Sequence, residues 1–304
     1  MNKEKYLEEK YIKTKNKVRK ITTYKDGENP LRKRHEDIEK FLTENCRVSI
    51  FAKAYTEKSS IVKNAQAHMY NDIFLFFDVK NFFPSINHNY LAKQLYRELK
   101  KNNSVTLNSC SRLVELCSVG KKGLPLGLVT SPVLSNIYMK EFDNILYGWL
   151  KKLDLRNVIY TRYADDIIIS YKGDTVRDRE IKAIVYRALD RVGLKSNQGK
   201  ERVFDIRKGG HVRITGVNVT RDDDDYRRLS VGRKRKDELY EQAVRYVTEE
   251  KRDQEEALKI KGYEAFVLSV EGEHYEKCFS EGMIAVMETL GYHSLHELIG
   301  HITY

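Results

Sequence analysis

Two apolar runs flank an acidic pair in the stretch Val158-Ile-Tyr-Thr-Arg-Tyr-Ala-Asp-Asp-Ile-Ile-Ile-Ser170. The β-branched and aromatic residues on both sides predict two short strands joined at Asp165-Asp166. An acidic pair between such strands is costly unless the carboxylates are exposed at a turn or paired with cations. The pattern therefore permits two interpretations, an ordinary solvated hairpin turn or a pair of carboxylates kept for chemistry.

A third carboxylate ends another apolar strand, because Asp78 follows Ile73-Phe-Leu-Phe-Phe77. If this strand lies beside those around Asp165-Asp166, three carboxylates converge at one edge of a sheet. Three hard anionic oxygens are the ligands that Mg²⁺ prefers. Two such ions roughly 4 Å apart can hold the attacking and leaving oxygens of a phosphoryl transfer. The acidic residues thus predict a site for phosphoryl chemistry.

The rest of the chain predicts a mixture of helices and strands, the α+β class. The Lys-rich residues 1–20 are expected to begin as a helix, and residues 233–304 to be mostly helical with breaks at Gly262, Gly272 and Gly291. Ser131-Pro132 predicts a helix start, because serine caps helices and proline suits the first turn. The other predicted helices are 31–46, 87–101, 111–119 and 177–192, and the strands are 73–79, two within 157–171, 201–206, 211–219 and 226–232. This order is typical of a βαββαβ unit, the ferredoxin-like plan.

Charge is distributed unevenly along the chain. Its 304 residues include 55 Lys and Arg against 44 Asp and Glu, a formal net charge of +11. Residues 233–304 are acidic, with 10 Lys and Arg against 15 Asp and Glu, so the positive excess lies in residues 1–232. Phosphate groups attract such an excess, although many basic surfaces are merely solvated.

Several features argue against a membrane or an oxidising compartment. No apolar run is long enough to span a bilayer, and the N-terminus lacks the apolar stretch of a secretory signal. The four cysteines are scattered and form no CxxC pair, which disfavours a Cys-based zinc site. We therefore expect a cytoplasmic protein.

Four motifs, in order and at suitable spacings, resemble those of reverse transcriptases. Tyr163-Ala-Asp-Asp166 is similar to the YxDD motif, and Asp78-Val-Lys-Asn-Phe-Phe83 to the segment of the first catalytic aspartate. The others are Gly123-Leu-Pro-Leu-Gly127 with Thr130-Ser-Pro132, similar to LPQG…SP, and Gly193-Leu-Lys-Ser-Asn-Gln-Gly-Lys200, similar to GLxxNxxK.

The resemblance implies a right-hand polymerase with a ferredoxin-like palm, basic fingers and a helical thumb. The fingers and N-terminal region would be residues 1–70, and the palm 71–232 with a fingers segment at about 90–125. The thumb would be 233–304. Two further motifs resemble those of bacterial retron reverse transcriptases, Asn64-Ala-Gln-Ala-His68 (NAxxH) and Ile214-Thr-Gly216 (VTG). The alternative is another bacterial defence or group II intron-like reverse transcriptase.

The same resemblance implies the residues of the active site. Asp78, Asp165 and Asp166 would be catalytic and would bind two Mg²⁺ ions, with the Val79 carbonyl as a further ligand. Around the incoming nucleotide, Arg19 or Lys20 would contact the triphosphate, and Lys200 would lie near the pyrophosphate. Phe83 would be a steric gate against the ribose 2′-OH, and Phe82 would line the nucleotide pocket. Gly127 would allow the backbone to approach the templating pair closely. Plain core is an equal alternative for Phe82 and a weaker one for Phe83, and the alternative for Arg19 or Lys20 is a solvated cation.

RNA contacts are expected at two places. His68, with Asn64, has one interpretation in RNA recognition and another as a buried, hydrogen-bonded histidine. Arg233-Lys234-Arg235-Lys236 would contact a structured RNA, or would form a solvated face. Asp222–Asp225 is expected to be a hairpin tip that points away from the nucleic acid, because its charge repels phosphates.

The implied function is that of an RNA-directed DNA polymerase of the retron type. Such enzymes bind their own structured noncoding RNA, prime from an RNA 2′-OH and copy part of it with dNTPs into a branched RNA–DNA (msDNA). They usually act with a separate effector protein in anti-phage defence. One departure is Leu126, where the family usually has Gln, because leucine cannot donate a hydrogen bond near the nucleotide. It leaves open a non-catalytic RNA-binding scaffold.

Overall fold

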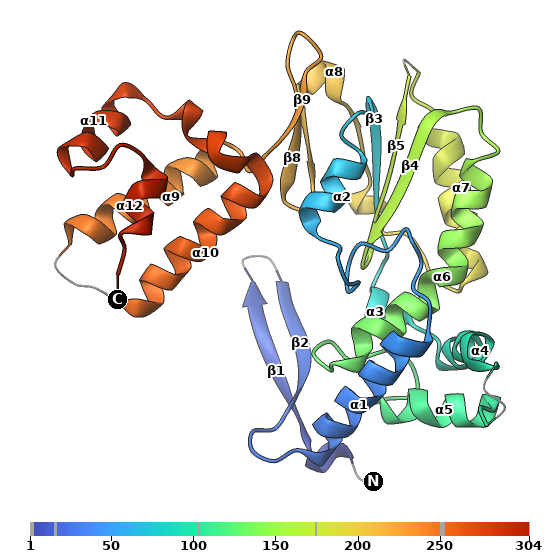
Figure 1. Cartoon of the computed structure of the whole chain (residues 1–304). Helices are drawn as coiled ribbons and strands as arrows, with labels where there is room; N and C mark the ends of the chain where they lie inside the picture. Colours follow the sequence, from blue (N-terminus) through green and yellow to red (C-terminus); the bar gives the residue numbers. More distant parts are fainter. Residues whose placement is uncertain (1–2, 15–16, 102–103, 174, 250–252, 304) are drawn as a thin grey trace. The chain divides into compact units, whose positions relative to one another are not determined.

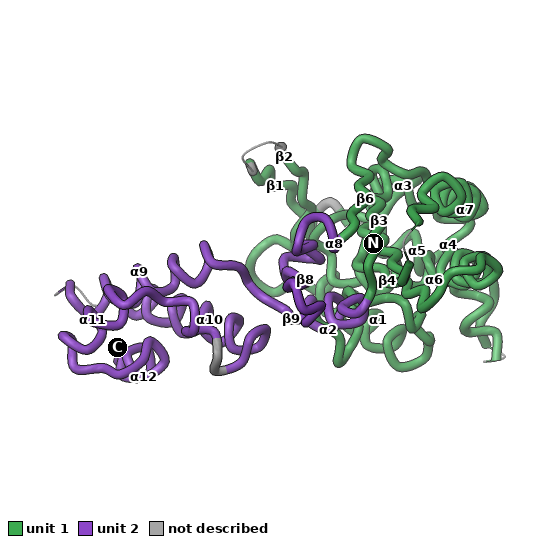
Figure 2. Tube along the Cα trace, turned by 90° about the horizontal axis from the view of Figure 1, so that it is seen from above, with its two compact units in different colours: residues 1–60, 71–205 green, residues 61–70, 206–304 purple. Residues whose placement is uncertain are grey.

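The computed structural model describes residues 3–14, 17–101, 104–173, 175–249 and 253–303. The chain forms two compact units, which Figure 2 distinguishes by colour. Unit 1 comprises residues 1–60 and 71–205, and unit 2 comprises residues 61–70 and 206–304. The short segment 61–70 therefore belongs with the C-terminal part of the chain, although unit 1 precedes and follows it in the sequence.

A four-stranded antiparallel sheet forms the centre of unit 1. Its strands are β3 (Ile73–Asp78), β4 (Arg156–Tyr163), β5 (Asp166–Lys172) and β6 (Arg202–Asp205), in the order β4-β5-β3-β6. Helices separate β3 from β4 and β5 from β6 along the chain (Figure 1). This is the βαββαβ arrangement of the ferredoxin-like plan, and the prediction is confirmed.

The two faces of this sheet differ. Ile73, Leu75 and Phe77 of β3 pack in one core with the helices α6 (Thr130–Leu150) and α7 (Asp178–Arg191). Because side chains alternate along a strand, Phe74, Phe76 and Asp78 lie on the opposite face. The face of β3 that carries Asp78 is therefore the one that does not contact these helices.

The remaining helices of unit 1 are α1 (Pro30–Asn45), α3 (Phe82–Ser85), α4 (His88–Leu99), α5 (Leu107–Leu116) and the 3-10 helices η1 (Lys3–Lys5) and η2 (Gln198–Lys200). Asn87 caps α4 as predicted, since its side chain accepts a hydrogen bond from the amide of Tyr90. The predicted cap of α6 is wrong. Ser131 lies inside that helix, and its hydroxyl donates to the Pro125 carbonyl at 2.6 Å.

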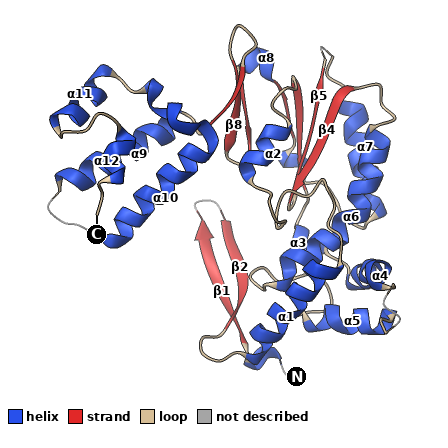
Figure 3. Cartoon of the chain, viewed as in Figure 1, coloured by secondary structure: helices blue, strands red, loops and turns tan. Residues whose placement is uncertain are grey.

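The N-terminal helix predicted for residues 1–20 is also wrong. The segment forms an antiparallel hairpin of β1 (Leu7–Thr14) and β2 (Lys17–Tyr24), which Figure 3 draws in red. Leu7 and Tyr11 are four residues apart, a spacing that puts them on one face of a strand as well as of a helix. Leu7 and Tyr24 are buried with Leu31 and Leu128, and this tertiary contact favours the strand.

Unit 2 contains a small antiparallel sheet and a group of helices. The sheet consists of β7 (His211–Ile214), β8 (Val217–Arg221) and β9 (Arg227–Ser230), against which α2 (Ile61–Ala67) packs. The single strand predicted for 211–219 is wrong, because Thr215 and Gly216, both with positive φ, form a turn within it. Asp222–Asp225 lies in the loop between β8 and β9, as predicted.

The helices of unit 2 are α8 (Ile206–Gly209), α9 (Arg233–Thr248), α10 (Gln254–Glu271), the 3-10 helix η3 (Gly272–Cys278), α11 (Glu281–Thr289) and α12 (Leu295–Gly300). Gly272 ends α10, with φ +65°, and Gly291 follows α11. The predicted break at Gly262 is wrong, because this residue lies inside α10. None of the described helices has both the length and the apolar composition that crossing a membrane requires.

Candidate active site

The three predicted aspartates come together at one end of the sheet in unit 1. Asp78 ends β3 and pairs in register with Asp166, the first residue of β5. Residues directly opposite each other in an antiparallel sheet have Cβ atoms about 4.5–5.5 Å apart. The amide of Val79 donates to the carbonyl of Asp165 at 3.0 Å, which ties the third aspartate to the same edge. The three aspartates thus lie at one edge of the sheet, as expected.

Electrostatics at this edge favour a bound cation. Burial raises the pKa of Asp166 to about 6, with further contributions from Asp165 and Asp78. The pKa of Asp165 is raised as well, first by burial and then by Asp78. These shifts mean that the carboxylates resist ionisation where they lie, since each is partly removed from water and beside another acid. A divalent cation would relieve this repulsion.

Asp78 already has a positive partner. Nζ of Lys200 lies 2.7 Å from Oδ2 of Asp78, and the Asn197 side chain donates to Oδ1 at 3.1 Å. The amide of Asn197 also donates to the Asp78 carbonyl at 2.7 Å. The segment that resembles GLxxNxxK therefore holds the first aspartate directly.

The donor chemistry of this edge fits Mg²⁺, because it offers three hard carboxylate oxygens and the Val79 carbonyl. Among the described residues, however, no three acidic, histidine or cysteine side chains are gathered as they would be around an ion. For Asp78 the physical reason is its ion pair with Lys200, because the carboxylate is turned towards that ammonium group rather than towards the other acids. A cation bound there would compete with Lys200 for the Asp78 carboxylate.

A cavity of about 430 Å³ opens beside the aspartates. Phe82 and Phe83 line it side by side, because their rings pack edge to face with centres 5.1 Å apart. Both side chains are largely buried and still line the cavity. The other lining residues include Asp78, Val79, Asp165, Lys200, Arg19, Lys20 and Leu126. The cavity thus gathers most of the residues predicted for the nucleotide pocket.

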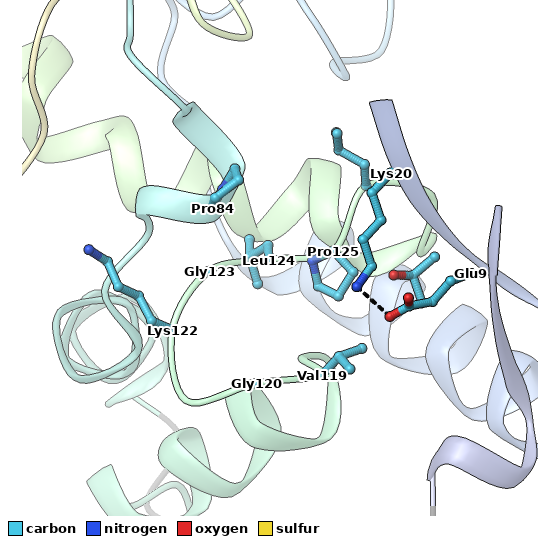
Figure 4. Close-up of a pocket in the computed structure, with 11 residues that line it drawn as sticks. Glu9, Lys20, Pro84, Val119, Gly120, Lys122, Gly123, Leu124 and Pro125 are labelled. Carbon is cyan, nitrogen blue, oxygen red and sulfur yellow. Dashed lines mark ion pairs between the residues drawn. The ribbon is translucent and has the colours of Figure 1, made fainter. Parts of the chain in front are cut away.

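Arg19 and Lys20 reach this cavity from the hairpin, but Lys20 has an additional partner. Its ammonium group forms an ion pair with Glu9 on β1 at 2.5 Å (Figure 4). Glu9 and Lys20 line an adjoining cavity of about 350 Å³, whose other lining residues include Val119, Gly120, Lys122, Gly123, Leu124, Pro125 and Leu126. Lys20 therefore lines two cavities, and a phosphate would have to compete with Glu9 for its charge.

Gly127 has a packing role that the sequence did not indicate. Its φ is +107°, and a Cβ there would lie 2.5 Å from the carbonyl oxygen of Thr22 and 2.7 Å from Cγ2 of Ile21. The neighbouring Leu126 carbonyl accepts a hydrogen bond from the amide of Thr22 at 2.8 Å. Glycine at this position thus lets the hairpin lie directly against the loop. Gly127 lines a third cavity, of about 290 Å³, and not the one beside the aspartates.

The predicted RNA contacts at Asn64 and His68 disagree with their positions. Both side chains are fully buried in unit 2. The Asn64 amide donates to the hydroxyl of Thr215 at 3.3 Å, which joins the NAxxH segment to the turn after β7. The physical reason for the correction is that α2 packs on the small sheet and encloses these side chains. The two motifs that resemble those of retrons therefore contact each other.

The four cations at the start of α9 differ in exposure. Lys234 has a side chain that is 90% exposed, and Arg233 is paired with Asp237 at the surface. Arg235 donates to the Gly216 carbonyl at 2.7 Å, and Lys236 is buried, with its ammonium group 2.9 Å from Glu271. The expected basic patch is thus divided, with two cations at the surface and two tied to neighbouring elements of unit 2.

Two residues near the site were not predicted. Tyr55 lines the cavity beside the aspartates and has a positive φ of 58°. Arg202 on β6 pairs in register with Phe76, and its guanidinium lies 5.1 Å from the Phe76 ring centre and 5.9 Å from that of Phe204. An arginine three positions before Asp205, in a four-residue strand, has no recognisable local signal. Only the strand register puts it on the face of Asp78.

Comparison with known proteins agrees with this geometry. A family model described as reverse transcriptase (RNA-dependent DNA polymerase) matches residues 9–244. The chain belongs to the reverse transcriptase family. Within this family, the retron Ec73 reverse transcriptase of Escherichia coli is 32% identical over 180 residues, 56% of this chain and 56% of that protein. The retron Ec86 reverse transcriptase of E. coli is 25% identical over 231 residues, 75% of this chain and 65% of that protein.

The predicted resemblance to bacterial retron reverse transcriptases is thereby confirmed. The chain spans less than two thirds of the length of either relative. Among solved structures, a telomerase from Candida albicans in complex with a TWJ fragment of telomeric RNA has a TM-score of 0.50 and 12% identity. That match covers 96% of this chain and 58% of the telomerase. It supports the predicted polymerase fold of this reverse transcriptase.

Proposed function

We propose that this chain is an RNA-directed DNA polymerase of the retron type. The observation that carries the proposal is the register pair of Asp78 and Asp166, with Asp165 tied to it, beside a cavity lined by aromatic and cationic residues. In this proposal, residues 1–70 belong to the fingers, 71–232 to the palm and 233–304 to the thumb. Helices α4 and α5 lie in the fingers segment at about 90–125.

The proposed chemistry assigns a task to the residues in and beside the cavity. Asp78, Asp165, Asp166 and the Val79 carbonyl would hold two Mg²⁺ ions, which stabilise the charge that develops during phosphoryl transfer. Arg19, Lys20 and Lys200 would bind the phosphates of the incoming dNTP. Phe82 and Phe83 would bound the sugar, where a buried ring leaves little room for a 2′-hydroxyl group.

The proposed substrate is a structured noncoding RNA made from the same locus. The chain would start DNA from a 2′-OH of that RNA and copy part of it, giving branched msDNA, with a separate effector protein in anti-phage defence. The similarity to the Ec73 and Ec86 retron enzymes supports this assignment. Exposed Arg233 and Lys234 are proposed to contact the RNA. Asn64 and His68 are proposed to hold α2 on the small sheet.

The test is incorporation of dNTPs by a variant that carries both Asp165→Asn and Asp166→Asn. We expect the variant to lose incorporation on the cognate RNA and to keep its affinity for that RNA, because the substitutions remove metal ligands and preserve side-chain volume. Undiminished synthesis by the variant would refute the polymerase assignment. A wild-type protein that binds RNA without Mg²⁺-dependent extension would instead indicate a non-catalytic scaffold.

A separate measurement tests the retron assignment. Nucleic acid that co-purifies with the wild-type protein would be sequenced before and after debranching. A short RNA joined through a 2′-linkage to DNA is the expected result. Linear complementary DNA alone, made by an active protein, would favour the other bacterial reverse transcriptases.

A further inference from the structure

A fully buried arginine lies directly behind the acidic turn. Arg162, on β4, forms an ion pair with Asp143 of α6 through Nε to Oδ1 at 2.8 Å and Nη2 to Oδ2 at 2.9 Å. Both side chains are completely inaccessible to solvent. The Tyr160 hydroxyl donates to the same carboxylate at 2.6 Å. A buried ion pair is weak as a source of stability, so its position next to Asp165 suggests another role.

The remaining nitrogen of the guanidinium reaches the turn. Nη1 of Arg162 donates to the carbonyl of Ala164 at 3.2 Å and to Oδ1 of Asn136 at 3.1 Å. Ala164 has a φ of +56°, a left-handed conformation that is unfavourable for a residue with a Cβ. It immediately precedes Asp165. The arginine thus holds the strained residue that sets the direction of the first acid of the pair.

The same network reaches a second left-handed residue. The side-chain amide of Asn136 donates to the carbonyl of Ala54 at 2.9 Å, and Ala54 precedes Tyr55, whose φ is +58°. The main chain of Arg162 also pairs with this segment, since its amide donates to the Phe51 carbonyl at 2.8 Å and its carbonyl accepts from Lys53 at 2.7 Å. Asp165 and Tyr55 both line the cavity beside the aspartates.

We propose that Arg162 and Asn136 are positioning residues that jointly orient Asp165 and Tyr55 towards the cavity. Residues in sparsely populated backbone conformations persist only where their surroundings hold them, and here one buried network holds both. The network thereby sets the affinity of the site for divalent cations and for the incoming nucleotide. The inference rests on the proposed function, because it assigns the cavity to those two ligands.

The test compares two buried polar residues on the same helix. Asn136 and Tyr138 of α6 are both fully buried, and each donates to a backbone carbonyl of another segment, Ala54 for Asn136 and Val192 for Tyr138. Only Asn136 contacts the arginine. Asn136→Ala is therefore the test variant and Tyr138→Phe its matched control. Mn²⁺ binding to the full chain is measured by calorimetry, alongside the melting temperature and the KM for dNTP.

We expect Asn136→Ala to weaken Mn²⁺ binding at least fivefold and to raise the KM for dNTP, while Tyr138→Phe changes neither. Arg162→Lys should follow Asn136→Ala, because an ammonium group cannot reproduce the planar fork that contacts Asp143, Asn136 and Ala164 together. Asn136→Ser serves if the alanine variant does not fold. Unchanged Mn²⁺ affinity in the folded Asn136 variant, or an equal loss in Tyr138→Phe, would overturn the positioning role.

These outcomes are distinct from failure of the proposed function. If the wild-type protein binds Mn²⁺ and incorporates dNTPs but the Asn136 and Arg162 variants do so equally well, only the positioning role is refuted. If the Asp165→Asn and Asp166→Asn protein binds Mn²⁺ as the wild type does, the metal site itself is wrong.

Discussion

Lys200 and Asp78 form an ion pair of 2.7 Å at the edge of the central sheet. The lysine comes from η2, and the aspartate ends β3, so a contact across 122 positions of sequence neutralises one of three clustered acids. Asp165 and Asp166 have no equivalent ion pair among the described contacts. The negative charge of the three aspartates is thus partly compensated by a cation that belongs to the chain.

Lys200→Ala is expected to strengthen Mg²⁺ binding and at the same time to slow dNTP incorporation. Removal of the ammonium group frees Asp78 and makes the site more negative, so the Mg²⁺ concentration for half-maximal thermal stabilisation should fall. Incorporation should slow by roughly 10- to 100-fold, because Lys200 is proposed to bind the phosphates of the dNTP and loss of a charged hydrogen bond costs about 1.5–3 kcal/mol. Lys195→Ala is the control, because Lys195 lies on the same segment but does not line the cavity. Weaker Mg²⁺ binding in Lys200→Ala would contradict this role.

The pH dependence of stability should reflect the raised pKa of Asp166, about 6. A raised carboxylate pKa means that the folded chain holds the proton more tightly than the unfolded chain. In the absence of metal, the contribution of protonated Asp166 to the free energy of unfolding is therefore complete below about pH 4. This contribution is lost as the pH rises through about 6. Because Mg²⁺ needs the ionised form, the increase in melting temperature on adding Mg²⁺ should grow over the same interval.

Melting temperatures measured in EDTA and in Mg²⁺ between pH 4 and pH 8 check this expectation. In Asp166→Asn the contribution of this carboxylate is absent, so its stability in EDTA should decline less with rising pH. Parallel profiles for the variant and the wild type would show that Asp166 titrates normally.

Gly127→Ala is expected to loosen the N-terminal hairpin. The added methyl group would lie 2.5 Å from the Thr22 carbonyl oxygen, and overpacking of this kind typically costs about 1–3 kcal/mol. Limited proteolysis within residues 7–24 should accelerate, and the KM for dNTP should rise because Arg19 and Lys20 belong to the hairpin. Gly120→Ala, in the same loop, meets only the Lys122 carbonyl at 3.8 Å and should change neither quantity. Equal behaviour of the two variants would exclude the packing role.

The four cations of α9 should divide into two functional pairs. Arg233→Ala with Lys234→Ala should weaken binding of the cognate RNA more than of random RNA, and reduce the salt dependence by about one to two phosphate contacts, without lowering the melting temperature. Lys236→Ala should instead lower stability by about 3 kcal/mol, because the mostly buried Glu271 carboxylate would lose its ion-pair partner and keep only its hydrogen bonds from Ser230 and Val231. Filter binding at several salt concentrations, with thermal melts, checks both. Equal losses of affinity for cognate and random RNA would show that Arg233 and Lys234 contribute only non-specific electrostatic attraction.

Much of the candidate site could be predicted because its signals are local. The apolar runs around Asp78 and Asp165-Asp166 predict strands, because short runs of β-branched and aromatic residues favour the extended backbone, and their order predicts the ferredoxin-like plan. The motif that contains Lys200 could likewise be identified from a short stretch of sequence. These features predicted β3, β4 and β5 and placed the aspartates at one edge.

The sequence alone determined the family, the central sheet and the identity of the three candidate aspartates, since each corresponds to a short pattern of residue types. Tertiary structure decided whether the other polar residues face a ligand or the interior. It turned the N-terminal segment into a hairpin, buried His68 and Lys236, and brought Asn136 to Arg162 across 26 positions of sequence. The physical reason is that a polar group is satisfied by whichever partner lies nearest in space, and packing between distant segments chooses that partner.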